Sequence, residues 1–237
     1  STFTCPTTAR CNVQVADAPV FMDGAGRVFV YGTQSGDTIS VDISAGAVRV
    51  VLNESQVFFP LAEVTSVFVN GRAGADTIYI GPGVKSPEVR GSMGSDTITI
   101  DSEYGAIVYG GEGNDVIFGG PGDDFINGKK GNDLIYGRGG NDYIQGGDGD
   151  DFIDGGAGDD VLVGYWGNDV IYGGEGNDTI VAGPADLPPG KTDDDLIYGG
   201  EGNDIINGGP GQDTVYAGPG NNILAATDGE VDTLHRN

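Results

Sequence analysis

The feature that most constrains this chain is a nine-residue repeat that begins at Gly110. Most units share glycine at positions one and four, Asn or Asp at position five, Asp at position six and an aliphatic residue at position eight. The units read, in order, GGEGNDVIF, GGPGDDFIN, GKKGNDLIY, GRGGNDYIQ, GGDGDDFID, GGAGDDVLV, GYWGNDVIY, GGEGNDTIV, then, after the eight residues AGPADLPP, GKTDDDLIY, GGEGNDIIN, GGPGQDTVY and AGPGNNILA. Twelve consecutive short units predict a solenoid of stacked coils.

Each unit combines a tight turn with a short strand. Glycines at positions one and four allow positive φ and close backbone approach, so the first six residues are expected to form the turn. The last three form a strand whose middle residue, at position eight, is always aliphatic. This column points inward, because side chains alternate across a strand. It consists of Ile117, Ile126, Ile135, Ile144, Ile153, Leu162, Ile171, Ile180, Ile197, Ile206, Val215 and Leu224.

Two units make one 18-residue coil, so the predicted fold is all-β. We expect a parallel β-roll, or β-helix solenoid, with two parallel sheets that face each other across a thin aliphatic core. Turns of odd units should line one edge and turns of even units the other. The regular 18-residue coils are expected from about residue 110, with wider and less regular coils at the N-terminal end.

Position six carries the residues that could bind a ligand. It holds Asp115, Asp124, Asp133, Asp142, Asp151, Asp160, Asp169, Asp178, Asp195, Asp204 and Asp213, and only Asn222 departs. Stacked coils place these carboxylates about 4.8 Å apart along each edge, where unpaired like charges repel. A hard cation that binds six to eight oxygens, from carboxylates and turn carbonyls, would make this column stabilising. Calcium fits this requirement better than magnesium, which prefers a small octahedron and retains water.

With these residues in view, the pattern G-G-x-G-x-D-x-U-x resembles the RTX (hemolysin-type) calcium-binding nonapeptide repeat. The resemblance covers residues 110 to 234 and implies a parallel β-roll with Ca²⁺ between successive turns. In that family the Asp at position six is a ligand together with turn carbonyls. This role carries to the eleven Asp above and, one coil earlier, to Asp96. Asn222, the non-glycine residues Lys129, Arg138 and Tyr165, and the insertion before Gly190 depart from the family pattern.

Charge restricts the partners of the chain. Acidic residues outnumber basic ones 36 to 11, which gives a formal net charge of -25. Nucleic acid is excluded, because a binding surface for it needs the opposite sign. Pairing successive Asp along both edges gives roughly ten calcium sites, whose charge would nearly cancel that of the chain. The cation-free chain is therefore expected to repel itself and to be largely unfolded.

Residues before the repeat keep a related spacing. Apolar segments recur at 28–32, 48–52, 67–71, 88–92 and 106–110, and a second series recurs at 37–41, 57–61, 76–80, 96–100 and 115–119. We expect about 20 residues per coil, with Asp37, Asp76 and Asp96 stacked on Asp115, and we include Asp37 and Asp76 as possible further metal ligands. The predicted organisation is a cap over 1–27, wide coils over 28–109 and the nonapeptide roll over 110–237, all continuous in one domain.

Two cysteines, Cys5 and Cys11, lie in the predicted cap. They fit a disulfide in an oxidising compartment better than a zinc site, which usually needs four ligands. The pair also fits export through an N-terminal leader. No apolar run is long enough for a membrane span, so membrane insertion is not expected.

The outward positions of the odd-unit sheet carry a row of aromatic residues. Phe118, Tyr136, Tyr172, Tyr198 and Tyr216 form this possible interface. The row could mediate self-association, contact a cell surface or stack on sugar rings. Alternatively, it only stabilises the cross-strand ladder.

The function predicted from these features is a secreted or cell-surface calcium-binding structural β-roll without catalytic activity. It would act as an extracellular scaffold or interaction module. The alternative is a carbohydrate- or partner-binding module that uses the aromatic face. A polysaccharide-modifying enzyme is less favoured, because every Asp of the repeat is periodic, and the lone His235 offers little acid-base chemistry. Ice binding is also less favoured, because position three has no regular row of Thr.

Overall fold

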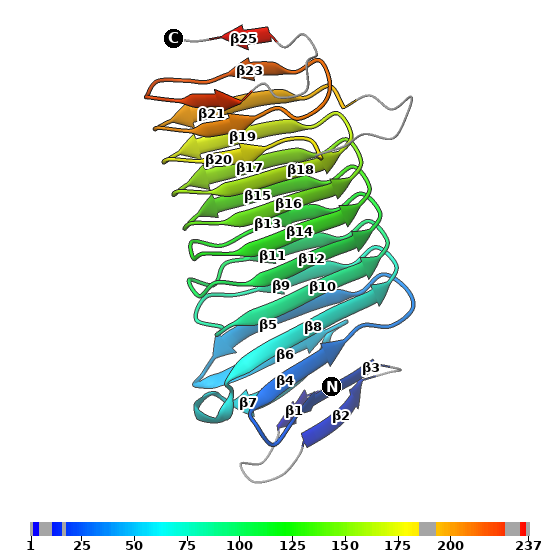
Figure 1. Cartoon of the computed structure of the whole chain (residues 1–237). Coiled ribbons are helices and arrows are strands. Elements are labelled where there is room, and N and C mark those ends of the chain that lie inside the picture. Colours follow the sequence, from blue (N-terminus) through cyan, green and yellow to red (C-terminus); the bar gives the residue numbers. More distant parts are fainter. Residues whose placement is uncertain (1, 5–10, 16–17, 185–192, 226–232, 236–237) are drawn as a thin grey trace.

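The computed structural model describes residues 2–4, 11–15, 18–184, 193–225 and 233–235. Figure 1 shows a stack of coils that runs from the N-terminal strands at one end to the C-terminal strand at the other. Two sheets lie face to face along the whole stack. The structure is an all-β parallel solenoid, as the repeat predicted.

Within the described residues the first sheet, sheet A, has 13 strands. In spatial order these are β1 (Thr2–Thr4), β7 (Ser55–Pro60), β6 (Ala47–Leu52), β5 (Thr38–Ser44), β9 (Thr77–Ile80), β11 (Thr97–Ile100), β13 (Val116–Phe118), β15 (Leu134–Gly139), β17 (Phe152–Ala157), β19 (Val170–Glu175), β21 (Leu196–Glu201), β23 (Thr214–Tyr216) and β25 (Thr233–His235). From β5 to β25 every neighbouring pair is parallel.

The second sheet, sheet B, has 12 strands in the same described part. Its order is β2 (Cys11–Val15), β3 (Ala18–Met22), β4 (Arg27–Tyr31), β8 (Ser66–Ala73), β10 (Pro87–Met93), β12 (Ile107–Glu112), β14 (Phe125–Lys130), β16 (Tyr143–Asp148), β18 (Val161–Trp166), β20 (Thr179–Val181), β22 (Ile205–Asn207) and β24 (Ile223–Ala225). Odd repeat units therefore contribute to sheet A and even units to sheet B. One short 3-10 helix, Leu61–Glu63, follows β7.

One buried apolar cluster runs through the strands before the repeat and continues as the aliphatic column predicted at position eight. Its residues from Ile117 to Ile206 are at most 1% exposed, and Val215 is 3% exposed. Leu224, in the last unit, is only partly buried and packs against this cluster. Burial of an Ile side chain contributes about 1.5 to 3 kcal/mol, so the column is the main apolar contribution within the repeat.

Many regular strands are longer than the three residues expected. Leu134–Gly139, for example, continues through the first three positions of the next unit, and its partner Phe152–Ala157 pairs with it over this length. The tight turn therefore occupies only positions four to six. Backbone pairing between coils continues through the glycines, because they tolerate the bend.

The N-terminal strands differ from the expected coils. The segments 48–52 and 57–61 were expected to stack as successive coils, but β6 and β7 instead form an antiparallel meander with β5. Two-residue loops explain this: Ala45 and Gly46, and then Asn53 and Glu54, all have positive φ. Such a pair of left-handed residues forms the type I′ turn that closes a hairpin.

As a consequence, β4 pairs directly with β8, and β5 pairs directly with β9. Sheet B begins with a similar antiparallel meander of β2, β3 and β4. The regular solenoid thus starts at β4 and β5. Cys5 lies outside the described residues, so the disulfide with Cys11 remains a prediction, as does the division of the chain into cap, wide coils and roll.

Candidate metal centre

The position-six aspartates form two continuous columns, one at each edge of the sheets. On the edge of the odd units, each aspartate amide donates to Oδ1 of the aspartate in the next coil, at 2.7 to 2.9 Å. This column runs through Asp37, Asp76, Asp96, Asp115, Asp133, Asp151, Asp169, Asp195 and Asp213.

The second column begins when Ala106 donates to Oδ1 of Asp124, at 2.7 Å. It continues through Asp142, Asp160, Asp178 and Asp204, with donor to acceptor distances of 2.8 to 3.1 Å. Both columns bridge the eight-residue insertion, because Asp169 meets Asp195 and Asp178 meets Asp204 in the ordinary register. The insertion therefore leaves the stacking of the coils intact.

One oxygen of each carboxylate is thus used by the backbone, while the other has no hydrogen-bond partner in most turns. In the columns these buried Oδ2 atoms belong to Asp76, Asp96, Asp115, Asp133, Asp142, Asp151, Asp160, Asp169, Asp178, Asp195 and Asp204, and Asp193, beside the odd-unit column, has one as well. Each of these residues is at most 2% exposed, apart from Asp151 at 3%. Buried charged oxygens without partners are costly, so each requires a compensating group.

The first aspartate of each column is different. Oδ2 of Asp37 accepts the N–H of Thr33 at 2.6 Å, and Oδ2 of Asp124 accepts the N–H of Gly120 at 2.7 Å. Both oxygens of each of these two carboxylates therefore have hydrogen-bond partners. At this end of each column, no additional group is needed to bind the carboxylate oxygens.

The atoms around position one explain why glycine is needed there. A Cβ built on Gly128 would lie 2.2 Å from Oδ2 of Asp133, and one on Gly146 would lie 2.3 Å from Oδ2 of Asp151. Positive φ occurs at position four, for example at Gly131, and not at Gly128. The glycine at position one therefore leaves space for the carboxylate rather than supplying a left-handed backbone.

Burial has a strong effect on the acidity of these carboxyl groups. Desolvation, with neighbouring carboxylates adding to it, raises the pKa of Asp142 and of Asp151 from 3.8 to about 8. The same causes raise the pKa of Asp195 to about 9, against the lowering effect of the Asp169 N–H. Without cations, the columns thus hold their negative charge at a large energetic cost.

Asn222 shows which groups lie beside the atom that takes the place of an aspartate Oδ2. Its Oδ1 accepts the amide of Asp204 at 2.8 Å, as an aspartate Oδ1 does. Its Nδ2 donates to the carbonyl oxygens of Ala217 and Gly218, at 2.8 and 3.0 Å. In an aspartate turn, the second carboxylate oxygen takes the place of this donor, and we expect it to face the corresponding carbonyls. Such a set of acceptors without a proton between them suits a hard cation.

Side chains alone do not complete such a site. Among the residues that the structure describes, no three carboxylate, imidazole or thiol groups gather around one point. A bound cation would therefore need main-chain carbonyls beside one or two carboxylates. Calcium, which accepts six to eight oxygens in flexible geometry, fits this donor set.

The aromatic row of sheet A is a ladder of rings stacked between strands. Ring centroids are 5.2 Å apart for Phe118 and Tyr136, 4.6 Å for Tyr172 and Tyr198, and 4.9 Å for Tyr198 and Tyr216. Phe152 fills the step between Tyr136 and Tyr172. Most ring faces are thus directed at neighbouring rings.

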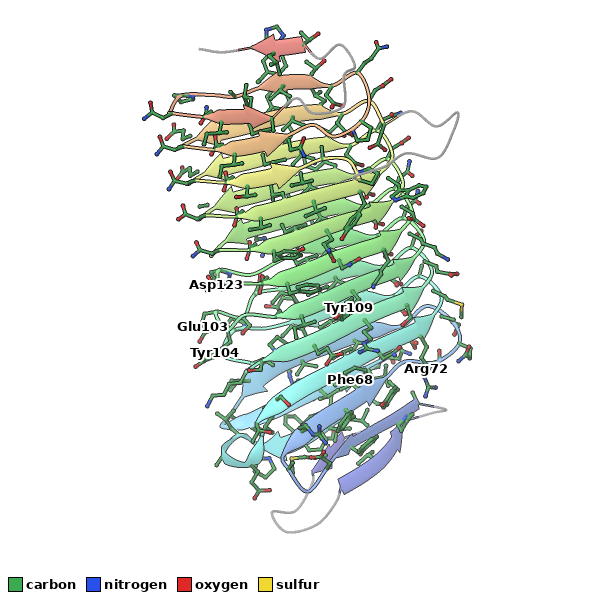
Figure 2. All side chains as sticks on the ribbon, viewed as in Figure 1. Phe68, Arg72, Glu103, Tyr104, Tyr109 and Asp123 are labelled. Carbon is green, nitrogen blue, oxygen red and sulfur yellow. The ribbon has the colours of Figure 1, made fainter. Side chains whose placement is uncertain are left out.

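A second aromatic group, on sheet B, includes Phe29, Tyr31, Phe68, Tyr109 and Phe125. Figure 2 shows Phe68 and Tyr109 on the outer face of this sheet, with Arg72 toward its edge.

Basic side chains cover rings on both sheets. Lys129 and Arg138 have positive φ at position two, where most units have glycine, and reach back over Tyr109 and Phe118. The sequence marked both residues only as departures from the repeat. Their cation-π contacts give a structural reason for these departures.

Asp193 is the buried residue that sequence reasoning missed. It replaces glycine at position four of the unit GKTDDDLIY and is 1% exposed. The signal was visible as a third consecutive aspartate in a unit that directly follows the insertion.

In the described part of the chain, no helix is long and apolar enough to cross a bilayer.

No curated protein matches this chain. The family model of the RTX calcium-binding nonapeptide repeat, which contains four copies, matches residues 104–135, 129–162, 136–171, 145–180 and 189–224. Together these segments cover just under half of the chain. The match includes the regular coils and the column aspartates from Asp115 to Asp213. The chain therefore carries RTX calcium-binding nonapeptide repeats within residues 104–180 and 189–224, and its parallel solenoid is consistent with the β-roll of that family.

Proposed function

We propose that this protein is a secreted structural β-roll that folds when calcium binds along both aspartate columns. In this proposal, ions lie between successive turns, and each uses a carboxylate together with turn carbonyls. The proposed ligands are Asp96, Asp115, Asp124, Asp133, Asp142, Asp151, Asp160, Asp169, Asp178, Asp195, Asp204 and Asp213. Asp76 is added because its buried Oδ2 lacks a partner, whereas Asp37 and Asp124 are weaker candidates because the amides of Thr33 and Gly120 already bind their second oxygens.

The observation that carries the proposal is the contrast between Asn222 and the aspartates. At Asn222 an amide group satisfies the turn carbonyls directly. At Asp204, the preceding residue of the same column, the equivalent oxygen has no partner. A cation would satisfy both the carboxylate and the carbonyls. In the aspartate turns, calcium would therefore replace the contacts that the side-chain amide makes in the Asn222 turn.

Charge balance supports several ions per chain. Roughly ten divalent cations would nearly cancel the net charge of -25, whereas the cation-free columns must protonate or repel. Because the carboxylates converge only in the folded chain, cation binding and folding are coupled. We therefore expect the cation-free protein to be largely unfolded under neutral conditions.

An extracellular location suits this mechanism. Extracellular calcium modules typically bind with Kd values of about 10⁻⁴ to 10⁻³ M, so a chain with such sites would fold after export. Repeats of this family are typical of secreted proteins and of structural, non-enzymatic domains. We accordingly propose a scaffold or interaction role at the cell surface or in the matrix, without a catalytic site.

The alternative is a module that binds a partner or a carbohydrate through the aromatic row of sheet A. The stacked rings favour the ladder interpretation, because most faces that could stack on a sugar already contact neighbouring rings. Retention on polysaccharide or cell-envelope fractions, abolished by Tyr172→Ala, would support the alternative.

The direct test is a titration of chelator-stripped protein with Ca²⁺, followed by far-UV circular dichroism and calorimetry, with Mg²⁺ as the control cation. We expect a cooperative transition from coil to β structure and several ions bound per chain. A stripped protein that is already fully β and binds no calcium would disprove the proposed function.

A further inference from the structure

The insertion before Gly190 changes the composition of one turn. Asp193 holds position four of its unit, where each of the other eleven units has glycine. It is 1% exposed, as is Asp169 in the preceding coil. A buried carboxylate outside the nine-residue period therefore lies beside the odd-unit column.

One oxygen of Asp193 has a structural role. The N–H of Gly167 donates to its Oδ1 at 2.9 Å. In a regular turn this amide meets a main-chain carbonyl of the next coil, as Gly149 meets Trp166 at 2.8 Å. The Asp193 side chain thus replaces a carbonyl oxygen. A neutral acceptor would suffice for this contact, so it does not account for the second, charged oxygen.

That second oxygen and the second oxygen of Asp169 lie beside the same short segment, Ala182-Gly183. A Cβ built on Gly183 would lie 2.4 Å from Oδ2 of Asp193. A Cβ built on Gly164 would lie 2.2 Å from Oδ2 of Asp169 and 2.5 Å from the carbonyl oxygen of Ala182. Both carboxylate oxygens therefore border the Ala182-Gly183 segment, and neither has a hydrogen-bond partner. The pKa of Asp169 is raised to about 7, mainly by burial and further by the Asp193 carboxylate.

We propose that Asp193 supplies a second carboxylate to a calcium site beside Ala182-Gly183, and that this is the tightest cation site of the chain. The inference rests on the proposed function, because it assumes that the columns bind calcium. A regular turn offers at most one unpartnered carboxylate oxygen, whereas Asp193 adds a second such oxygen beside that of Asp169. Ligand charge count is a main determinant of calcium affinity, so affinity on the order of tenfold above that of a regular turn is expected.

The single tryptophan of the chain provides a local reporter. Trp166 directly precedes Gly167, whose amide contacts Asp193. Terbium replaces calcium in oxygen sites, and its emission, when excited through tryptophan, reports only ions near that ring. We expect the first Tb³⁺ ions added to the stripped wild-type protein to give this emission, and an excess of Ca²⁺ to remove it.

The decisive comparison is Asp193→Asn against Asp194→Asn. Asparagine at 193 keeps an acceptor for Gly167 but removes the charge, whereas Asp194 is exposed and its Oδ1 accepts only the Gln212 amide in the described contacts. Asp193→Asn should shift the midpoint of tryptophan-sensitised emission upward on the order of tenfold. Asp194→Asn should leave it within about twofold, because an exposed charge is screened.

Equal midpoints for the two variants would overturn the inference. If Asp193→Asn fails to fold in calcium, the emission midpoint is measured on Asp193→Gly instead, because glycine occupies this position in the other units. Calorimetry on the same samples separates the two claims. Several calcium ions bound with no effect at residue 193 would refute only this inference, whereas no calcium binding at all would refute the proposed function as well.

Discussion

The amide of Asp115 donates to Oδ1 of Asp133 at 2.8 Å, so that the carboxylate of one coil is anchored on the backbone of the coil before it. Oδ2 of Asp133 is left buried without a partner. The same residue therefore holds the coils in register and creates a demand for positive charge. These two roles can be separated by mutation.

Asp133→Asn should separate them. The variant keeps an acceptor for Asp115 and gains a donor for the turn carbonyls, as in Asn222. We expect the stripped protein to retain more β structure and to bind about one calcium ion fewer. Circular dichroism and calorimetry measure both effects. Asp150→Asn is the matched control, because Asp150 is exposed at position five, where Asn is common, and it should change neither quantity.

Gly128→Ala should disrupt the turn, whereas Gly139→Ala should not. An added Cβ at 128 would lie 2.2 Å from Oδ2 of Asp133, but at 139 its nearest contact is the carbonyl of Ala157 at 3.8 Å. We expect a loss of about 2 to 4 kcal/mol for Gly128→Ala and a change within about 0.5 kcal/mol for Gly139→Ala. Urea unfolding in saturating calcium checks this. Equal losses would show that the carboxylate does not occupy the space over Gly128.

The sequence predicted the repeating part of this structure because each position had one dominant physical role. Ile153 could only point inward, and Asp133 could only stack on Asp151 once the coils were 18 residues long. The N-terminal meander was not predictable from spacing, because a hairpin closed by Asn53-Glu54 lacks the usual glycine and imitates the 20-residue step. Asp193 was missed for a related reason, since its burial depends on where the insertion re-enters the stack.

The stability of the cation-free protein should fall as pH rises. Burial raises the pKa of Asp142 and Asp151 to about 8, from 3.8 in the unfolded chain. Between these values the folded state binds more protons than the unfolded state, so the free energy of unfolding decreases with pH. The contribution is fully present below about pH 4 and lost as pH passes the folded-state pKa values. Chelator-treated protein should therefore show more β structure at about pH 5 than at about pH 8.

Calcium should reverse this trend, because it competes with the same protons. Binding should release protons, and the apparent affinity for calcium should increase with pH over the same interval. Calorimetry in two buffers of different ionisation enthalpy measures the released protons. No proton release, together with stability independent of pH in chelator, would mean that the buried carboxylates are not the calcium ligands.

Asn222→Asp tests whether the amide at the end of the column replaces a cation. The substitution removes two donations, to Ala217 and Gly218, and brings a carboxylate oxygen against those carbonyls. Without calcium we expect a loss of about 1 to 3 kcal/mol from the unsatisfied acceptors. With calcium we expect most of the loss to be recovered and about one additional ion to bind. Asn221→Asp is the control, because Asn221 is exposed at position five of the same turn and should gain no ion. If Asn222→Asp loses the same stability in calcium as in chelator, the turn carbonyls do not form a cation site, and the ions must be held elsewhere in the coils.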